Sequence, residues 1–204
     1  MSEHGWFSRR ARVRILRLGF VPIAFVAVFG GRSWENESAK GFLIEALGYI
    51  LLLTGTGLRL WATLYIGGRK RSELVSDGPY SLCRNPLYVG TLLITAGASL
   101  CFGNFLMLAL SLGLMAPVHW LVVSAEERRL AERFGADYQA YVQRTPRFLL
   151  RFRAYTCPEW VSVSSRSMWS AVSETVLIVL LPLVGRLVEL LHDKGVLPVL
   201  WKVA

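Results

Sequence analysis

The chain alternates between long apolar segments and short polar links. Five apolar segments are predicted to be helices: about 13–30, 41–66, 86–102, the run from the Gly103-Asn104 turn to about 123, and about 171–191. Most are near the ~20 apolar residues that a helix needs to cross a membrane. The third and fourth are joined only by that short turn, which predicts a helical hairpin. The pattern therefore predicts an all-α polytopic membrane protein, one domain over residues 1–204 with about five transmembrane helices.

Composition agrees with this pattern. Hydrophobic residues make up 53% of the chain and charged residues only 18%, whereas soluble domains carry about 25% charged residues. The net charge is +9, which in a soluble protein would suggest nucleic acid as a partner. Here the basic residues lie between apolar segments, so membrane lipids explain them better and nucleic acid is not expected.

The basic residues also predict an orientation. They collect before the first segment, in residues 67–85, and in residues 124–170, which hold eight arginines. The opposite links hold only Arg32, Lys40 and two lysines in the C-terminal tail. Cytoplasmic loops are rich in Lys and Arg, so we expect the N-terminus and both long polar stretches inside and the C-terminus outside. The first segment lacks a small-residue cleavage site and is expected to stay as a membrane anchor.

The first long polar stretch is residues 73–90. Asp77, Gly78 and Pro79 have turn chemistry. Asn85 is predicted to cap the next helix with its side-chain oxygen, and Pro86 suits the first helical position. Arg84 beside that helix start would favour an anion, although Asn85 and Pro86 are equally explained as a helix start alone.

The second polar stretch is residues 126–147, where the fourth segment leaves the membrane. Glu126 and Glu127 could bind a cation or ligand hydroxyls, or could form a solvated turn in which Glu126 pairs with Arg129 or Arg133. Phe134, Tyr138 and Tyr141 recur at helical spacing, so one helix face is aromatic. That face could equally be an interfacial helix resting on lipid headgroups.

Other features are expected to be structural. Arg59 lies near a helix end and should snorkel or pair with a carboxylate, and Arg186 should pair with Glu189. Gly55 and Gly57 should serve helix packing. The three cysteines have no disulfide or metal spacing and are expected to be reduced and buried. No nucleotide-binding fingerprint, Walker loop or zinc motif is present, and no metal is expected.

Two motifs carry a family resemblance. They are GPYSLCRNPLYVG over residues 78–90 and EERRLAERFGADYQAYVQRTPRFL over residues 126–149, separated by the predicted hairpin. Together they resemble the superfamily of isoprenylcysteine carboxyl methyltransferases and phospholipid methyltransferases. The resemblance covers about residues 47–150, and the segment at 171–191 lies outside it. Asn85 stands where the isoprenylcysteine enzymes usually have His, while Asn occurs there in phosphatidylethanolamine methyltransferases.

The resemblance implies S-adenosylmethionine as cofactor and a lipophilic membrane substrate, either an isoprenylcysteine-type carboxylate or a lipid amine. It implies catalytic roles for Arg84, Asn85, Glu127 and Arg147. It also implies a cofactor pocket lined by Tyr80, Asn85, Pro86, Leu87, Tyr88, Gly90, Glu126, Glu127, Tyr138, Tyr141, Arg144 and Pro146.

Two rival classes of function remain open. Membrane sterol reductases share a similar Arg-His-Pro-x-Tyr passage and use NADPH, whose 2′-phosphate would require several arginines. A non-enzymatic membrane scaffold with a degenerate site is the other, suggested only by Asn85. Binding of S-adenosylmethionine or NADPH, or of neither, separates the three. The sequence leaves open the methyl acceptor and the role of the last segment.

Overall fold

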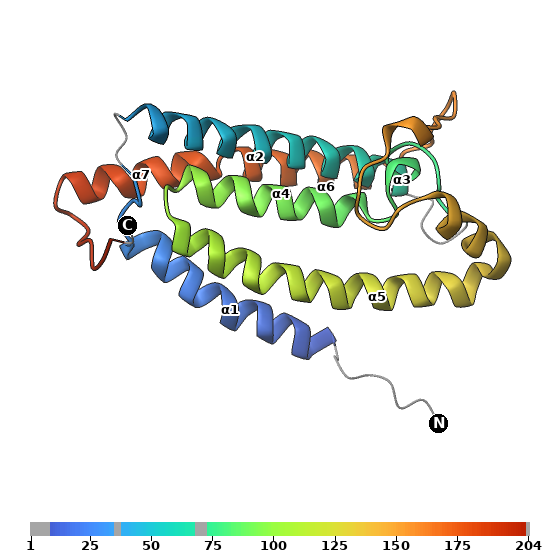
Figure 1. The fold of residues 1–204 in the computed structure, drawn as a ribbon, viewed down its shortest axis with the longest axis horizontal. Helices are drawn as coiled ribbons and strands as arrows, with labels where there is room; N and C mark the ends of the chain where they lie inside the picture. Colours follow the sequence, from blue (N-terminus) through green and yellow to red (C-terminus); the bar gives the residue numbers. More distant parts are fainter. Residues whose placement is uncertain (1–8, 35–37, 68–72, 203–204) are drawn as a thin grey trace.

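The computed structural model describes residues 9–34, 38–67 and 73–202 of the chain. Its helices are α1 (Arg9–Phe29), α2 (Ala39–Ile66), α3 (Pro79–Leu82), α4 (Pro86–Cys101), α5 (Phe105–Arg144), the short 3-10 helix η1 (Phe152–Ala154), α6 (Ser165–Val179) and α7 (Leu181–Asp193). Helices α2, α4 and α5 lie roughly side by side, with α1 along α5, and α6 and α7 against the α2–α4 pair (Figure 1).

The prediction of an all-α membrane protein is confirmed. Within the part of the chain that the structure describes, three stretches are long and apolar enough to span a membrane, namely α2, α5 and the continuous run Ser165–Asp193, and the apolar parts of α1 and α4 are shorter. The last predicted segment is not one straight helix, because it breaks at Leu180 before Pro182 and forms α6 and α7. Proline lacks the N–H that would continue the helical hydrogen bonds.

Helices α2 and α4 pack very closely against each other. Gly55 and Gly90 face each other so closely that a Cβ on Gly55 would lie 2.7 Å from the Gly90 carbonyl oxygen. A Cβ on Gly97 would overlap the backbone nitrogen of Leu52. Small residues allow this approach in membranes, where packing rather than hydrophobicity holds helices together. The predicted packing role is thus confirmed for Gly55, whereas Gly57 faces open space.

Helix α5 connects the membrane part to the second polar stretch. Its straight part, residues 105–134 before the bend at Gly135, is about 45 Å long, longer than the ~30 Å hydrocarbon core. The helix therefore continues well past the membrane boundary predicted near residue 123. It bends at Gly135, whose φ of +48° is open to glycine but strained for other residues.

Helices α6 and α7 attach through ion pairs as well as apolar contacts. Arg186 on α7 pairs with Glu189 at 2.9 Å, as predicted, and with Glu45 on α2 at 2.6 Å. Arg32 joins both carboxylates, at 3.4 Å to Glu45 and 2.9 Å to Glu189. These alternating charges lie at the end of the bundle opposite α3 and tie α7 to α2.

A second ion pair joins α6 to α2. Arg59 donates to Glu174 from Nε at 2.9 Å and to Thr91 on α4 at 2.6 Å. The expected carboxylate partner of Arg59 is therefore confirmed, and it comes from the segment outside the family resemblance. The cysteine prediction is confirmed in part: all three are free, Cys83 and Cys101 are buried, but Cys157 is exposed.

The α2–α4 contact makes a test of the packing. Gly97→Ala should lower thermal stability in detergent, by about 1–3 kcal/mol, because the new methyl meets backbone that cannot move aside. Gly113→Ala is the matched control, since a Cβ there meets nothing within 4 Å. Equal melting temperatures for the two variants would contradict the close packing.

Candidate active site

The two polar stretches meet where α4 begins. Tyr88 on the first turn of α4 donates to Glu126 Oε2 on α5 at 2.9 Å. Asn85 Nδ2 donates to Glu127 Oε1 at 3.0 Å. Residues about forty positions apart are thus in direct contact. The predicted approach of the two stretches is confirmed.

A cavity of about 540 Å³ lies at this meeting point. That volume is within the range of about 300–1,000 Å³ usual for cofactor and ligand sites. Its walls come from the end of α2, the link before α3, the start of α4 and one face of α5. The lining residues are Ile66, Glu73, Leu74, Val75, Tyr80, Arg84, Asn85, Leu87, Tyr88, Val122, Ala125, Glu126, Arg129, Leu130, Arg133 and Tyr141.

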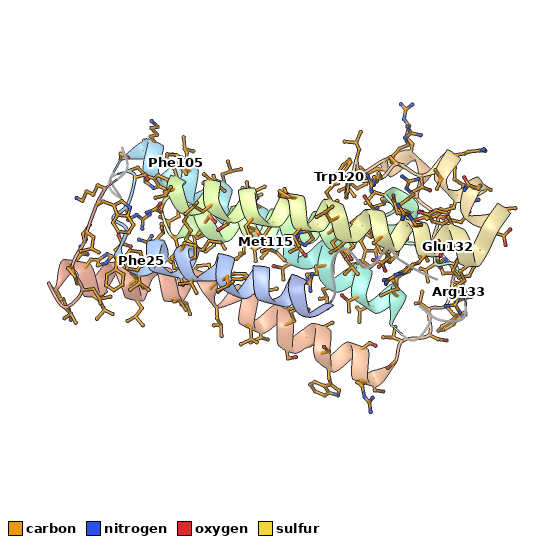
Figure 2. All side chains as sticks on the ribbon, turned by 90° about the horizontal axis from the view of Figure 1, so that it is seen from below. Phe25, Phe105, Met115, Trp120, Glu132 and Arg133 are labelled. Carbon is orange, nitrogen blue, oxygen red and sulfur yellow. The ribbon has the colours of Figure 1, made fainter. Side chains whose placement is uncertain are left out.

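The α5 wall of the cavity changes character along the helix. Val122, Glu126, Arg129 and Arg133 line it at intervals of three or four residues, so they share one helix face. The wall is apolar toward the membrane, acidic in the middle and basic at the far end. Figure 2 shows Glu132 and Arg133 at the polar end of α5, with Phe105 at the opposite end and Trp120 between them. Such a wall suits a ligand with both a cationic and an anionic group.

Glu127 does not line the cavity but holds its walls together. Its carboxylate lies between two guanidinium groups, with Arg84 Nε at 3.3 Å and Arg147 Nε at 3.0 Å. These are ion pairs rather than aligned hydrogen bonds, because neither Nε has a hydrogen-bond partner among the described residues. Arg147 also donates to Ser124 at 2.7 Å and stacks over Trp120 at 4.3 Å. The carboxylate therefore joins three parts of the chain.

The prediction that Asn85 caps α4 with its side chain is wrong. Asn85 occupies the N-cap position, but its side chain makes no capping hydrogen bond. The amide instead donates to Glu127 and, at 3.2 Å, to the Arg147 carbonyl. Both bonds use the Nδ2 donor and lead away from the helix, and the side-chain oxygen that a cap requires accepts no N–H of the first turn. The helix start is served by Pro86 at its first positions, as predicted.

Tyr80 places a donor in the cavity wall. Its side chain is 7% exposed, and its hydroxyl has no hydrogen-bond partner among the described residues. The neighbouring Tyr141 donates to the Tyr80 carbonyl at 2.7 Å. Burial raises the pKa of both tyrosines well above its usual range, so each remains a neutral phenol at physiological pH. A buried phenol without a partner is unfavourable unless a ligand or water completes it.

The structure separates the predicted site residues into two groups. Those that line the cavity are Tyr80, Arg84, Asn85, Leu87, Tyr88, Glu126 and Tyr141. Those outside its lining are Pro86, Gly90, Glu127, Tyr138, Arg144, Pro146 and Arg147. Gly90 packs against Gly55 and Arg59, and Arg144 reaches Ser76 at 3.5 Å. Tyr138 and Tyr141 are buried against protein rather than resting on lipid headgroups, and the bend at Gly135 separates them from Phe134, so the predicted single aromatic face does not form.

Several lining residues were not assigned to the site from the sequence. Helical spacing from Glu126 would have identified Val122, Arg129 and Arg133, which lie one or two turns away on the same face. Ile66 ends α2, and Glu73–Val75 begin the first polar stretch, but no sequence pattern marks these residues individually as cavity-lining.

Comparison with known proteins agrees with the geometry. A family model described as phospholipid methyltransferase matches residues 43–137. The cobalt-zinc-cadmium resistance protein CzcN of Cupriavidus metallidurans is 34% identical over 94% of this chain and 88% of its own length. The chain belongs to the superfamily of integral membrane methyltransferases. The family model therefore covers α4 and most of α5, the two helices that carry the cavity.

Further relatives extend the comparison. The nickel-cobalt-cadmium resistance protein NccN of Alcaligenes xylosoxydans xylosoxydans is 32% identical over 94% of this chain and 89% of its own length. Protein-S-isoprenylcysteine O-methyltransferase of Schizosaccharomyces pombe is 31% identical, over 56% of this chain and 49% of its own length. No solved structure matches. The matches to CzcN and NccN must include most of α6 and α7, which lie beyond the family model.

The two adjacent glutamates should respond differently to the same change. Glu127→Gln should lower the free energy of unfolding in detergent by about 1–3 kcal/mol, seen as a lower melting temperature, because two poorly solvated guanidinium groups lose their counter-charge. Glu126→Gln should melt near the parent, because Gln can still accept from Tyr88. Equal losses of stability would contradict the separation of a structural from a cavity-lining carboxylate.

Asn85 gives a second test. Asn85→Asp keeps a good capping residue but removes the amide donor and places a second carboxylate beside Glu127. We therefore expect a clear loss of stability, on the order of 1–3 kcal/mol, measured by thermal unfolding in detergent. If Asp melts like the parent, capping is the main role of this position and the amide contacts contribute little.

Proposed function

We propose that this membrane methyltransferase transfers a methyl group from S-adenosylmethionine to a lipophilic acceptor at the membrane boundary. The observation that carries the proposal is the cavity between the two family motifs, which holds a carboxylate, a phenol without a partner and an apolar wall. The apolar end suits a membrane-derived acceptor, and the polar end suits a charged cofactor.

The residues of the cavity fit this cofactor. When bound, S-adenosylmethionine supplies a methyl group already activated on a sulfonium centre. Glu126 and the faces of Tyr80 and Tyr88 would favour its cationic groups. Arg129 or Arg133 would favour its carboxylate. The hydroxyl of Tyr80 would donate to an acceptor atom on the ligand.

The protein's contribution to such a reaction is alignment and exclusion of water. Asn85, Glu127 and Arg147 would act by fixing α4 against α5, and so would hold the cavity in shape. Arg84 reaches both the cavity and Glu127, so of the two arginines considered for a carboxylate acceptor it is the better placed. For an amine acceptor, Glu126 or a water would remove the proton.

The two metal-resistance relatives suggest a context. CzcN and NccN are named for resistance to divalent metals. We propose that any comparable role of this chain runs through methylation of a membrane component. A host that expresses the parent should then tolerate cobalt or cadmium better than one that expresses Glu126→Gln at equal level, and equal tolerance would reject this context.

We also propose the orientation predicted from the arginines, with the cavity on the cytoplasmic side. Cysteine labelling in the links at positions 36 and 72 would test this orientation, but both positions lie outside the described residues. Position 137 at the polar end of α5 and position 194 after α7 replace them. In intact cells, an impermeant thiol reagent should label Lys194→Cys and spare Asp137→Cys, and the reverse would overturn the orientation.

Binding of the cofactor is tested most sharply by two tyrosines. Tyr80→Phe removes a hydroxyl that has no hydrogen-bond partner among the described residues, so the melting temperature should not fall. Affinity for S-adenosylmethionine should fall, by about 2–10-fold if one neutral hydrogen bond is lost. Equilibrium binding of the radiolabelled cofactor measures this, with NADPH as competitor.

Tyr141→Phe is the matched control, because its hydroxyl is used within the protein. It should lose stability instead, through the broken bond to the Tyr80 carbonyl. Unchanged cofactor affinity in Tyr80→Phe would place the cofactor elsewhere. Displacement by NADPH would favour the reductase reading, and binding of neither would favour a scaffold.

A further inference from the structure

The segment after α5 crosses the end of the bundle beside α3 (Figure 1). We call residues 146–160 the strap. Backbone hydrogen bonds join it to the cavity wall, from Arg84 N to the Pro146 carbonyl at 2.9 Å and from Arg151 N to the Leu82 carbonyl at 3.0 Å. A third runs from Gly78 N to the Thr156 carbonyl at 2.7 Å. The strap is therefore hydrogen-bonded to the segment that carries Tyr80 and Arg84.

The inner side of the strap lies against the last two turns of α2. The Tyr155 ring is 5.9 Å from the Trp61 ring, and Cys157 Sγ is 3.1 Å from the Tyr65 hydroxyl. Helix α2 has 28 residues, so it extends about 42 Å and exceeds the ~30 Å hydrocarbon core by about two turns. In a membrane of that thickness its end, with the strap packed on it, would lie at the depth of the lipid headgroups.

The outer side of the strap is unusually apolar for a surface in water. Leu149 is 78% exposed, Phe152 71% and Trp160 86%. Three such side chains close together in sequence usually mark a contact with a partner or a membrane. Trp is also enriched at membrane interfaces, where its amphipathic ring suits the headgroup layer.

The charges of the strap favour one kind of membrane surface. Arg151 and Arg153 flank Phe152 and are exposed, and Glu159 is the exposed acidic residue of the strap. Arg166 follows near the start of α6. Basic residues interleaved with aromatic ones are attracted to anionic headgroups while the rings enter the interface.

We propose that the strap is an anchor for anionic lipid headgroups and that their contact steadies the wall of the cavity. Phe152, Leu149 and Trp160 insert at the interface, and Arg151 and Arg153 bind lipid phosphates. Because the strap is hydrogen-bonded to residues 78–84, the lipid surface limits the motion of that wall. The anchor itself does not depend on the proposed methyl transfer.

Depth in the membrane is the first readout. The full chain with Cys157→Ser and Trp160→Cys carries an environment-sensitive label, since Cys83 and Cys101 are buried. It is reconstituted in nanodiscs of phosphatidylcholine alone or with phosphatidylglycerol, and quenched by spin-labelled lipid. Each arginine near an anionic surface contributes about fivefold in binding. We expect the inserted fraction, relative to the water-exposed one, to rise about tenfold or more with phosphatidylglycerol.

Two controls accompany the measurement. A label at Asp137→Cys on α5 should stay in water in both lipids. Arg151→Gln/Arg153→Gln should lose most of the phosphatidylglycerol effect at position 160, whereas Lys194→Gln/Lys202→Gln removes the same charge at the other end of the bundle and should keep it. If a label at position 160 is as exposed to water as one at position 137, the anchor proposal is wrong. If insertion is equal in both lipids, or if the two double variants have equal effects, the proposed preference for anionic lipid is wrong.

Coupling to the cavity is the second readout, and it needs no cofactor. Hydrogen exchange of the Arg84 and Arg151 amides should slow when phosphatidylglycerol is added to the parent and should not slow in Arg151→Gln/Arg153→Gln. Unchanged exchange in the parent overturns the coupling. Failure of the methyl-transfer proposal would instead appear as absent cofactor binding with both lipid effects intact.

Discussion

The structure depends on one carboxylate held between two guanidinium groups. Glu127 reaches Arg84 from the first polar stretch and Arg147 from the segment after α5, and it accepts the amide of Asn85. Three parts of the chain that are distant in sequence meet at these two oxygen atoms. Buried charge is costly unless it is paired, so the arrangement favours one alignment of α4 on α5. The cavity is a consequence of that alignment.

This arrangement also explains why neighbouring glutamates differ in role. On a helix, adjacent residues point about 100° apart, so Glu126 and Glu127 cannot face the same surface. Glu127 faces the arginines and becomes part of the framework. Glu126 faces the cavity and accepts a hydrogen bond from the Tyr88 hydroxyl. It lines the cavity together with Tyr80 and the apolar wall. One acidic pair thus supplies both the framework and a ligand-facing charge.

The hydropathy pattern was sufficient to predict an all-α membrane protein, because membrane-spanning helices are visible in a sequence as long apolar runs. The approach of the two polar stretches followed from charge asymmetry and motif order. The detailed roles did not follow. Asn85 is a good capping residue by type, but only the folded chain places the Glu127 carboxylate and the Arg147 carbonyl within reach of its amide donor. The break at Leu180 has a local cause in Pro182, which hydropathy alone does not register. The lining by Glu73–Val75 depends on tertiary contacts that no local pattern encodes.

The central claim is that the cavity between the two stretches holds the methyl donor. Ultraviolet crosslinking of tritiated S-adenosylmethionine to the reconstituted protein, followed by peptide mapping, tests it directly. The account predicts label on peptides from residues 73–88 and 122–141, removed by excess S-adenosylhomocysteine. Competed label confined to α1, α6 or α7, or no label that the competitor removes, would contradict it.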